Sequence, residues 1–165
     1  MKQLIVPYSI RGNATDYQKE LFNKLEEDYL TSPDSIEVAE DVAMSFVADF
    51  FTLSNKQIKN DVGGAQFFNE EYRINFREKA INSYYFALEQ WIMDYGLQNL
   101  PTVEDITIIK SELGDSFETC SVSLTWIYRN VTFDTSKLQN KGEIHLRYNK
   151  TSEKWELVAV YTSVD

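Results

Sequence analysis

The hydrophobic residues of the chain change their spacing once, at about Pro101. Before this residue they recur every three or four positions, as they do on one face of an α-helix. After it they alternate with polar residues, as they do in a β-strand that buries one of its two faces. Helices followed by a run of strands are typical of the α+β class, so we expect the helices to pack on an antiparallel sheet.

Two helices are expected in the first part of the chain. The first runs over about residues 16–30 and starts with a capping box, in which Thr15 and Gln18 each satisfy a free backbone N–H. The second follows Ser32-Pro33-Asp34, where the serine is an N-cap and the proline takes the first helical position, and it ends near Leu53. Both helices carry a hydrophobic stripe, so we expect both to contribute to the core.

A third, longer helix is expected over about residues 70–95, after a polar loop at residues 54–64. Asn69 is suited to cap its start and Gly96 to close its end. A break near Asn82-Ser83 would be compatible with the pattern. Unbroken, this helix is long enough to cross a small sheet.

The alternating part of the chain predicts four strands joined as a meander, at residues 103–111, 119–128, 142–148 and 155–163. The second strand is expected to face the core with Cys120, Val122, Leu124, Trp126 and Tyr128. In the fourth strand the same alternation places Leu157, Ala159 and Tyr161 on the inner face. His145 falls on the polar face of the third strand, away from the core.

The charge and the cysteine content of the chain exclude some classes of binding partner and some structural features. The chain has 165 residues and a net charge of −10, with no cluster of Lys and Arg. We therefore expect no nucleic-acid partner, since such proteins neutralise phosphates with basic patches, and no direct membrane insertion. The single cysteine, Cys120, excludes an internal disulfide and fits a cytosolic or an exported protein equally well. The apolar stretch that follows Met1 is too short for a signal peptide or a membrane span.

Few residue patterns carry chemistry. One Cys and one His cannot form a structural zinc site, and the acidic residues lack the spacing of a calcium loop. Gly63-Gly64 lacks the context of a phosphate-binding loop, and no serine lies in a nucleophile elbow. We therefore expect no metal ion and no cofactor, and we assign no catalytic residue.

Aromatic residues make up 14% of the chain and gather on the expected inner face of the sheet and on the long helix. Such rings are suited to core packing or to an aromatic-lined pocket for a small apolar ligand. If a pocket forms, its candidate ligand-binding residues are Tyr85, Trp126, Tyr128 and Tyr161.

The order of two helices, a long helix and four antiparallel strands resembles the nuclear transport factor 2-like, or cystatin-like, superfamily over about residues 35–163. Val47-Ala48-Asp49-Phe50-Phe51 and Trp155-Glu156-Leu157-Val158-Ala159-Val160-Tyr161 carry the local likeness. The resemblance implies a roll in which a curved sheet wraps a long helix. The superfamily includes isomerase- and dehydratase-like enzymes with an Asp, His or Tyr inside the cone of the sheet, and non-catalytic domains of bacterial envelope and conjugation proteins. The best strands here place no Asp or Glu inward, which favours the non-catalytic members.

The leading hypothesis is a non-catalytic protein-interaction or assembly domain of a bacterial envelope or mobile-element protein, binding a protein partner or a second copy of itself as a homodimer. It would lie outside the cytoplasm, tethered by an anchor beyond this sequence. The alternatives are a small apolar ligand binder or an isomerase/dehydratase-like enzyme using the cone, and a cytosolic adaptor for a basic partner. We expect a single domain, with residues 1–31 as a helical arm and residues 32–165 as the roll.

Overall fold

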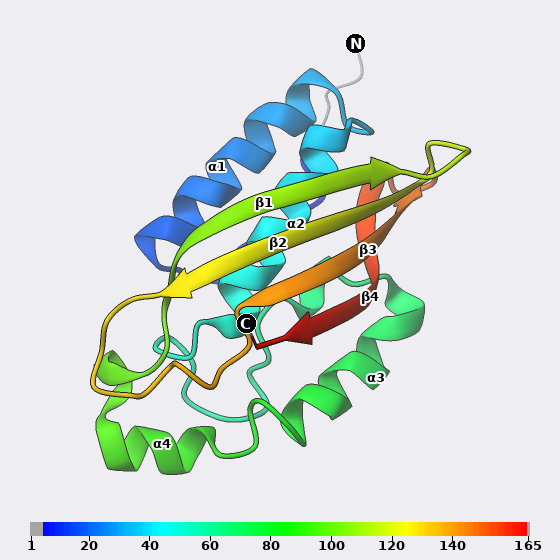
Figure 1. The fold of residues 1–165 in the computed structure, drawn as a ribbon. Helices are drawn as coiled ribbons and strands as arrows, with labels where there is room; N and C mark the ends of the chain where they lie inside the picture. Colours follow the sequence, from blue (N-terminus) through cyan, green and yellow to red (C-terminus); the bar gives the residue numbers. More distant parts are fainter. Residues whose placement is uncertain (1–4, 165) are drawn as a thin grey trace.

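The computed structural model describes residues 5–164 and confirms the α+β class: helices come first and a four-stranded antiparallel sheet follows (Figure 1). The helical elements are α1 (Asp16–Thr31), α2 (Ile36–Phe51), the 3₁₀ turn η1 (Ala65–Phe67), α3 (Glu70–Ile81), α4 (Leu88–Tyr95) and the 3₁₀ turn η2 (Leu97–Asn99). The strands are β1 (Val103–Leu113), β2 (Thr119–Tyr128), β3 (Lys141–Asn149) and β4 (Lys154–Ser163). Figure 1 shows a curved, open sheet in front of α1 and α2, with α3 and α4 below it.

The first two helices begin at side-chain caps. The predicted capping box of α1 is confirmed, because Gln18 N–H donates to Thr15 Oγ1 at 3.2 Å and Thr15 N–H donates to Gln18 Oε1 at 2.8 Å. The predicted start of the second helix is wrong. Ser32 is the C-cap of α1, which extends further than expected, and Ser35 caps α2 by accepting the Val38 N–H at 3.3 Å.

The helix expected over residues 70–95 is two helices, separated where a break had been considered. Asn82 Nδ2 donates to the Glu78 carbonyl at 2.9 Å, and Ser83 Oγ donates to the Lys79 carbonyl at 2.6 Å. The Ser83 hydroxyl thus occupies the carbonyl that its own N–H would reach in a continued helix, and the Ser83 N–H donates to the Ala80 carbonyl instead. The chain then turns so that Tyr85 is fully buried. No single long helix therefore crosses the sheet.

The sheet is the predicted meander, in the order β1-β2-β3-β4. The alternation predicted for β2 is confirmed for the side chains that it buries: Cys120, Val122, Leu124 and Trp126. Because one face of the strand is buried and the other carries Ser and Thr, the register of β2 against its neighbours is well specified.

The alternation predicted for β4 is wrong beyond Leu157. A bulge shifts its register against β3, so that Leu157 lies opposite Leu146 but Ala159 lies opposite His145. An extra residue on one strand moves every later side chain to the opposite face. Ala159 and Tyr161 therefore share the outer face with His145, and Val160 takes the inner position.

Helix α2 lies at the centre of the molecule. It packs against α1 on one side and against β1, β2 and β4 on the other. From α1, Leu25 and Tyr29 are buried in the same core as the inner face of the sheet, and the Tyr29 hydroxyl donates to the Glu153 carbonyl at 2.7 Å. The expected N-terminal arm is thus in close contact with the rest of the fold.

A buried group of charged side chains connects the loop after α2 to the C-terminal end of α2. Lys56 is fully buried, and its Nζ donates to the carbonyls of Asp49 and Thr52, each at 2.6 Å. The same Nζ lies 3.1 Å from Asp49 Oδ1, and Arg11 Nη1 lies 3.5 Å from that oxygen. Burial lowers the pKa of Lys56 to about 8. Burial also disfavours the Asp49 carboxylate, but the Lys56 charge and hydrogen bonds from Gln66 and Gly64 hold its pKa below the ordinary value.

Candidate ligand groove between α3 and β4

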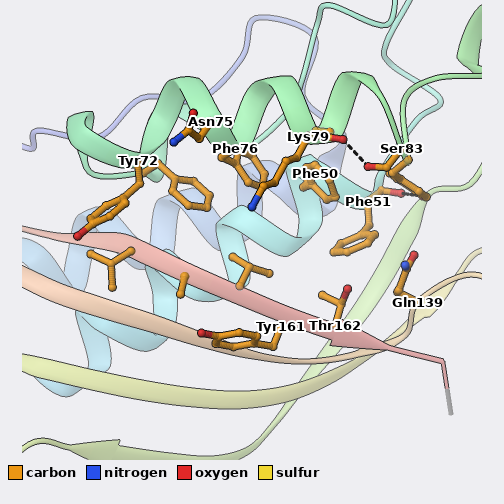
Figure 2. Close-up of a pocket in the computed structure, with 16 residues that line it drawn as sticks. Phe50, Phe51, Tyr72, Asn75, Phe76, Lys79, Ser83, Gln139, Tyr161 and Thr162 are labelled. Atoms are coloured by element: carbon orange, nitrogen blue, oxygen red, sulfur yellow. Dashed lines mark hydrogen bonds between the residues drawn. The ribbon is translucent and has the colours of Figure 1, made fainter.

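A groove with a volume of about 450 Å³ separates α3 from the last half of β4 (Figure 2). This volume lies within the range of small-molecule and peptide side-chain sites. Its lining comprises Phe50, Phe51, Phe68, Tyr72, Asn75, Phe76, Lys79, Ala80, Ser83, Tyr84, Gln139 and residues 158–162.

The wall of the groove on the helical side consists of aromatic rings held in fixed positions. The Phe76 ring stacks on Phe68 with centroids 4.1 Å apart and lies 5.3 Å from the ring of Phe50. Phe50 in turn stacks on Tyr84 at 5.5 Å. Tyr84 is anchored because its hydroxyl donates to the Phe51 carbonyl at 3.0 Å. Rings packed in this way present a preformed apolar surface, which lowers the entropic cost of binding.

Polar groups are few along the groove and are placed at its rim. Figure 2 shows Asn75 and Lys79 on α3 and Ser83 just beyond its end, with Gln139 and Thr162 on the opposite side. Lys79 is the one charged side chain in this lining, and it forms no ion pair with any residue between 5 and 164. The groove is therefore an apolar site with one available positive charge.

The groove runs along the free edge of β4, because β4 is the last strand of the sheet. The first half of this edge is capped. The Tyr8 hydroxyl accepts the Trp155 N–H at 2.7 Å and lies 3.3 Å from the Trp155 carbonyl, to which it donates. The Asn69 N–H donates to the Leu157 carbonyl at 2.8 Å. Beyond Leu157 the edge borders the groove.

The groove carries no obvious acid–base pair. Its described lining contains no Asp, Glu, His or Cys side chain. Burial raises the pKa of the Tyr84 hydroxyl well above its ordinary value, so this group stays protonated and acts as a hydrogen-bond donor. General acid–base catalysis needs a group that titrates near the working pH within reach of the substrate. The groove therefore offers apolar contact, hydrogen bonds and one positive charge to a bound molecule.

The structure separates the four candidate ligand-binding residues. Tyr161 lines the groove, although its side chain is 61% exposed and its ring lies 5.3 Å from that of His145 on the outer face. Tyr85 is fully buried, and its hydroxyl donates to the Phe50 carbonyl at 2.7 Å. Trp126 is buried and donates to the Tyr128 hydroxyl at 3.1 Å. The residues Tyr85, Trp126 and Tyr128 are not part of the groove lining.

Other reactive side chains lie away from the groove. His145 is on the outer face, as expected, with its Nε2 3.6 Å from Glu143 Oε2. Cys120 is buried in the core, and burial raises the pKa of its thiol to about 11, so it is a poor nucleophile at neutral pH.

The residues that sequence reasoning missed are those of the rim and of α3. Tyr72, Phe76 and Lys79 recur at helical spacing within the helix expected over residues 70–95. A lysine within that stripe was the available signal that the face is not wholly buried. Gln139 comes from a long connection and had no such signal.

Residues 5–164 contain no cluster of three or more His, Cys, Asp or Glu side chains arranged to hold a metal ion. Among the helices in this range, none has the length and apolar character needed to span a membrane. Comparison of the chain with protein-family models, with curated proteins and with solved structures gave no match.

Proposed function

We propose that this protein is a non-catalytic interaction domain that binds a segment of a protein partner in the groove between α3 and β4. The observation that carries the proposal is the combination of a preformed aromatic wall with an uncapped strand edge and a described lining without Asp, Glu, His or Cys. The chemistry available there is apolar contact plus hydrogen bonding. A partner protein outside the cytoplasm, as expected for a domain of an envelope or mobile-element protein, is compatible with this site.

The proposal is tested by placing a photo-crosslinking amino acid at Ser83, on the rim of the groove, in the protein expressed in its own source cells. We expect one discrete protein adduct after irradiation. The matched control places the same group at Ser121, which lies on the outer face of the sheet opposite His145. Adducts of equal yield at both positions, or none at Ser83, would count against the groove as the contact surface.

A second candidate function is the binding of a small apolar ligand in the same groove. The cavity volume of about 450 Å³ favours it, because it matches that of small-molecule sites. Native mass spectrometry of protein purified from its source cells separates the two candidates. A bound molecule of a few hundred daltons that is lost in the Phe76→Ala variant would favour the small ligand, and the absence of such a molecule favours the peptide segment.

A further inference from the structure

The backbone of β4 provides unused hydrogen-bonding groups at the groove. In an antiparallel strand the N–H and C=O of one residue point to the same side, and successive residues alternate between the two sides. The Ser163 carbonyl accepts from Asn140 N–H at 3.1 Å, and Asn140 immediately precedes β3, so Ser163 points to the β3 side. Thr162 and Val160 therefore direct their N–H and C=O groups away from β3, toward the groove.

No hydrogen bond to these outward-pointing groups of Val160 and Thr162 is formed by any residue of the described range 5–164. Earlier in β4, the backbone groups that point away from β3 do have partners: those of Trp155 bond to the Tyr8 hydroxyl, and the Leu157 carbonyl accepts from the Asn69 N–H. Proteins normally block strand edges, since a free edge recruits other strands. On β4 the capping stops where the groove begins.

The opposite edge of the sheet is blocked in a different way. The Ile106 N–H of β1 donates to the Tyr17 hydroxyl at 2.8 Å, and the Val103 N–H donates to Thr52 Oγ1 at 3.0 Å. Further along β1 the register shifts between Ile108 and Lys110, and such irregularities hinder edge pairing. The uncapped stretch of β4 is thus the part of the sheet best suited to accept another strand.

Charge limits what can occupy the groove. Lys79 is its one charged side chain and has no ion-pair partner within residues 5–164. A carboxylate on the occupant would pair with it. The chain as a whole carries a net charge of −10, which repels a polyacidic segment. The complementary occupant has one carboxylate within an otherwise apolar, uncharged stretch.

We infer that the partner segment binds as an added fifth strand: an extended peptide pairs with the backbone of Val160 and Thr162, packs apolar side chains on Phe76, and places a single Asp or Glu against Lys79. This inference rests on the proposed function and specifies its partner chemistry. Binding by strand addition obtains affinity from main-chain hydrogen bonds and specificity from the pockets that take alternate side chains.

The experiment begins with selection from a displayed library of random dodecapeptides against the whole chain, followed by synthesis of the most enriched peptide. Its affinity is measured by fluorescence anisotropy for the wild type and for Lys79→Glu, with Lys19→Glu on the exposed side of α1 as the charge control. We expect enriched sequences with one acidic residue among apolar ones. We also expect at least a ten-fold loss of affinity for Lys79→Glu and less than a two-fold change for Lys19→Glu.

Backbone pairing is tested on the same peptide. Amide hydrogen exchange followed by NMR should show that the Val160 and Thr162 amides become at least ten-fold slower to exchange on binding. Thr162→Pro removes one of these N–H groups without disturbing the pairing with β3, so it should weaken binding at least ten-fold, whereas Thr162→Val, which keeps the N–H, should not. A circular dichroism spectrum and an unfolding curve establish that the proline variant is folded. If it is not, the exchange result alone decides.

The outcomes separate this inference from the proposed function. A peptide whose binding is lost in Phe76→Ala, but which neither protects the two amides nor responds to Thr162→Pro, would overturn strand addition and leave the groove as the binding site. Enrichment of basic peptides, or insensitivity to Lys79→Glu, would overturn the acidic partner chemistry. If no enriched peptide loses affinity in Phe76→Ala, both the inference and the proposed function fail.

Discussion

The buried Asp41 of α2 should make the protein less stable as the pH rises toward neutrality. Its side chain is 1% exposed, and its Oδ1 accepts from Lys24 Nζ at 2.8 Å. Burial, together with the neighbouring carboxyl of Asp28, raises the pKa of Asp41 to about 8 from an ordinary value of 3.8. A protonated Asp41 carboxyl can donate to the Asp28 carboxylate, an interaction that raises the pKa of Asp41 and lowers that of Asp28. The folded state therefore holds a proton that the unfolded chain releases.

The sign of the effect follows from this proton. A group whose folded pKa is raised stabilises the protein fully below its unfolded pKa, and the contribution is lost as the pH rises through the folded pKa. Each pKa unit corresponds to about 1.4 kcal/mol, so the interval from pH 5 to pH 7.5 spans at most about 3.5 kcal/mol. The neighbouring Asp28 carboxyl, which helps to raise the pKa of Asp41, is 30% exposed, and solvent screening of its effect reduces the expected loss to about 2 kcal/mol.

Asp41→Asn tests this reasoning because an asparagine amide mimics the protonated carboxyl and can donate to Asp28 at every pH. Urea unfolding followed by tryptophan fluorescence at pH 5 and pH 7.5 gives the free energy of unfolding of both proteins. From pH 5 to pH 7.5, we expect the free energy of unfolding of the variant to increase by about 2 kcal/mol relative to that of the wild type. Glu27→Gln, an exposed change on the same side of the molecule, should follow the wild type. Parallel curves for Asp41→Asn and the wild type would refute the proposed proton.

Three further changes test the scaffold around the groove, each by urea unfolding. Lys56→Met removes three buried hydrogen bonds and should cost about 3 kcal/mol. The wild type should become more stable from pH 8 to pH 10, because Lys56 loses its proton in the folded state at a lower pH than in the unfolded chain. The Lys56→Met variant should not show this gain. Gly64→Ala should cost about 3 kcal/mol, because the residue has φ of 78° and an added Cβ would lie 2.5 Å from an α2 phenylalanine ring; Gly12→Ala, with nothing within 4 Å, should be neutral. Tyr8→Phe should lower the free energy of unfolding by about 1–2 kcal/mol, because the cap on β4 is lost. Tyr95→Phe should not lower it, because the Tyr95 hydroxyl has no hydrogen bond to another residue of the described chain. Equal losses for Gly64→Ala and Gly12→Ala, or for Tyr8→Phe and Tyr95→Phe, would contradict the contact of Gly64 or of Tyr8.

The features that could be predicted from the sequence are those set by neighbouring residues. The capping box of Thr15 and Gln18 is a contact over three positions, and the alternation in β2 is a property of the strand itself. The break at Asn82-Ser83 has the same local origin, because both side chains bond to carbonyls four residues back. Such patterns are readable because their geometry is fixed by backbone periodicity.

Where the candidate residues lie elsewhere than expected, the cause is contacts distant in sequence. The two-residue alternation of a regular strand placed Tyr161 on the inner face. The β4 bulge, however, depends on the pairing with β3 and has no signature in the β4 residues alone. Tyr85 and Trp126 were expected to line a pocket, but both are buried in the core and neither lines the groove.

The burial of Lys56 had no signal either. It lies in the stretch of residues 54–64 that was expected to form a polar loop. It is buried because carbonyls at the end of α2, the Asp49 carboxylate and the Asn55 amide converge on its Nζ. A charged residue is found in the interior when partners of this kind offset its desolvation, and sequence alone does not reveal their convergence.

The contact of Tyr8 with β4 also limits how early the chain can complete its fold during synthesis. Tyr8 and Trp155 are 147 positions apart, and Tyr29 and Glu153 are 124 apart. Neither tyrosine can reach its partner until residues 153–155 have left the ribosome, and closing such long loops is slow. Until then α1 and α2 lack the last strand that covers them, and the unfinished sheet ends at β3. Nascent chains halted before β4 should therefore depend on chaperones, whereas the released protein should not.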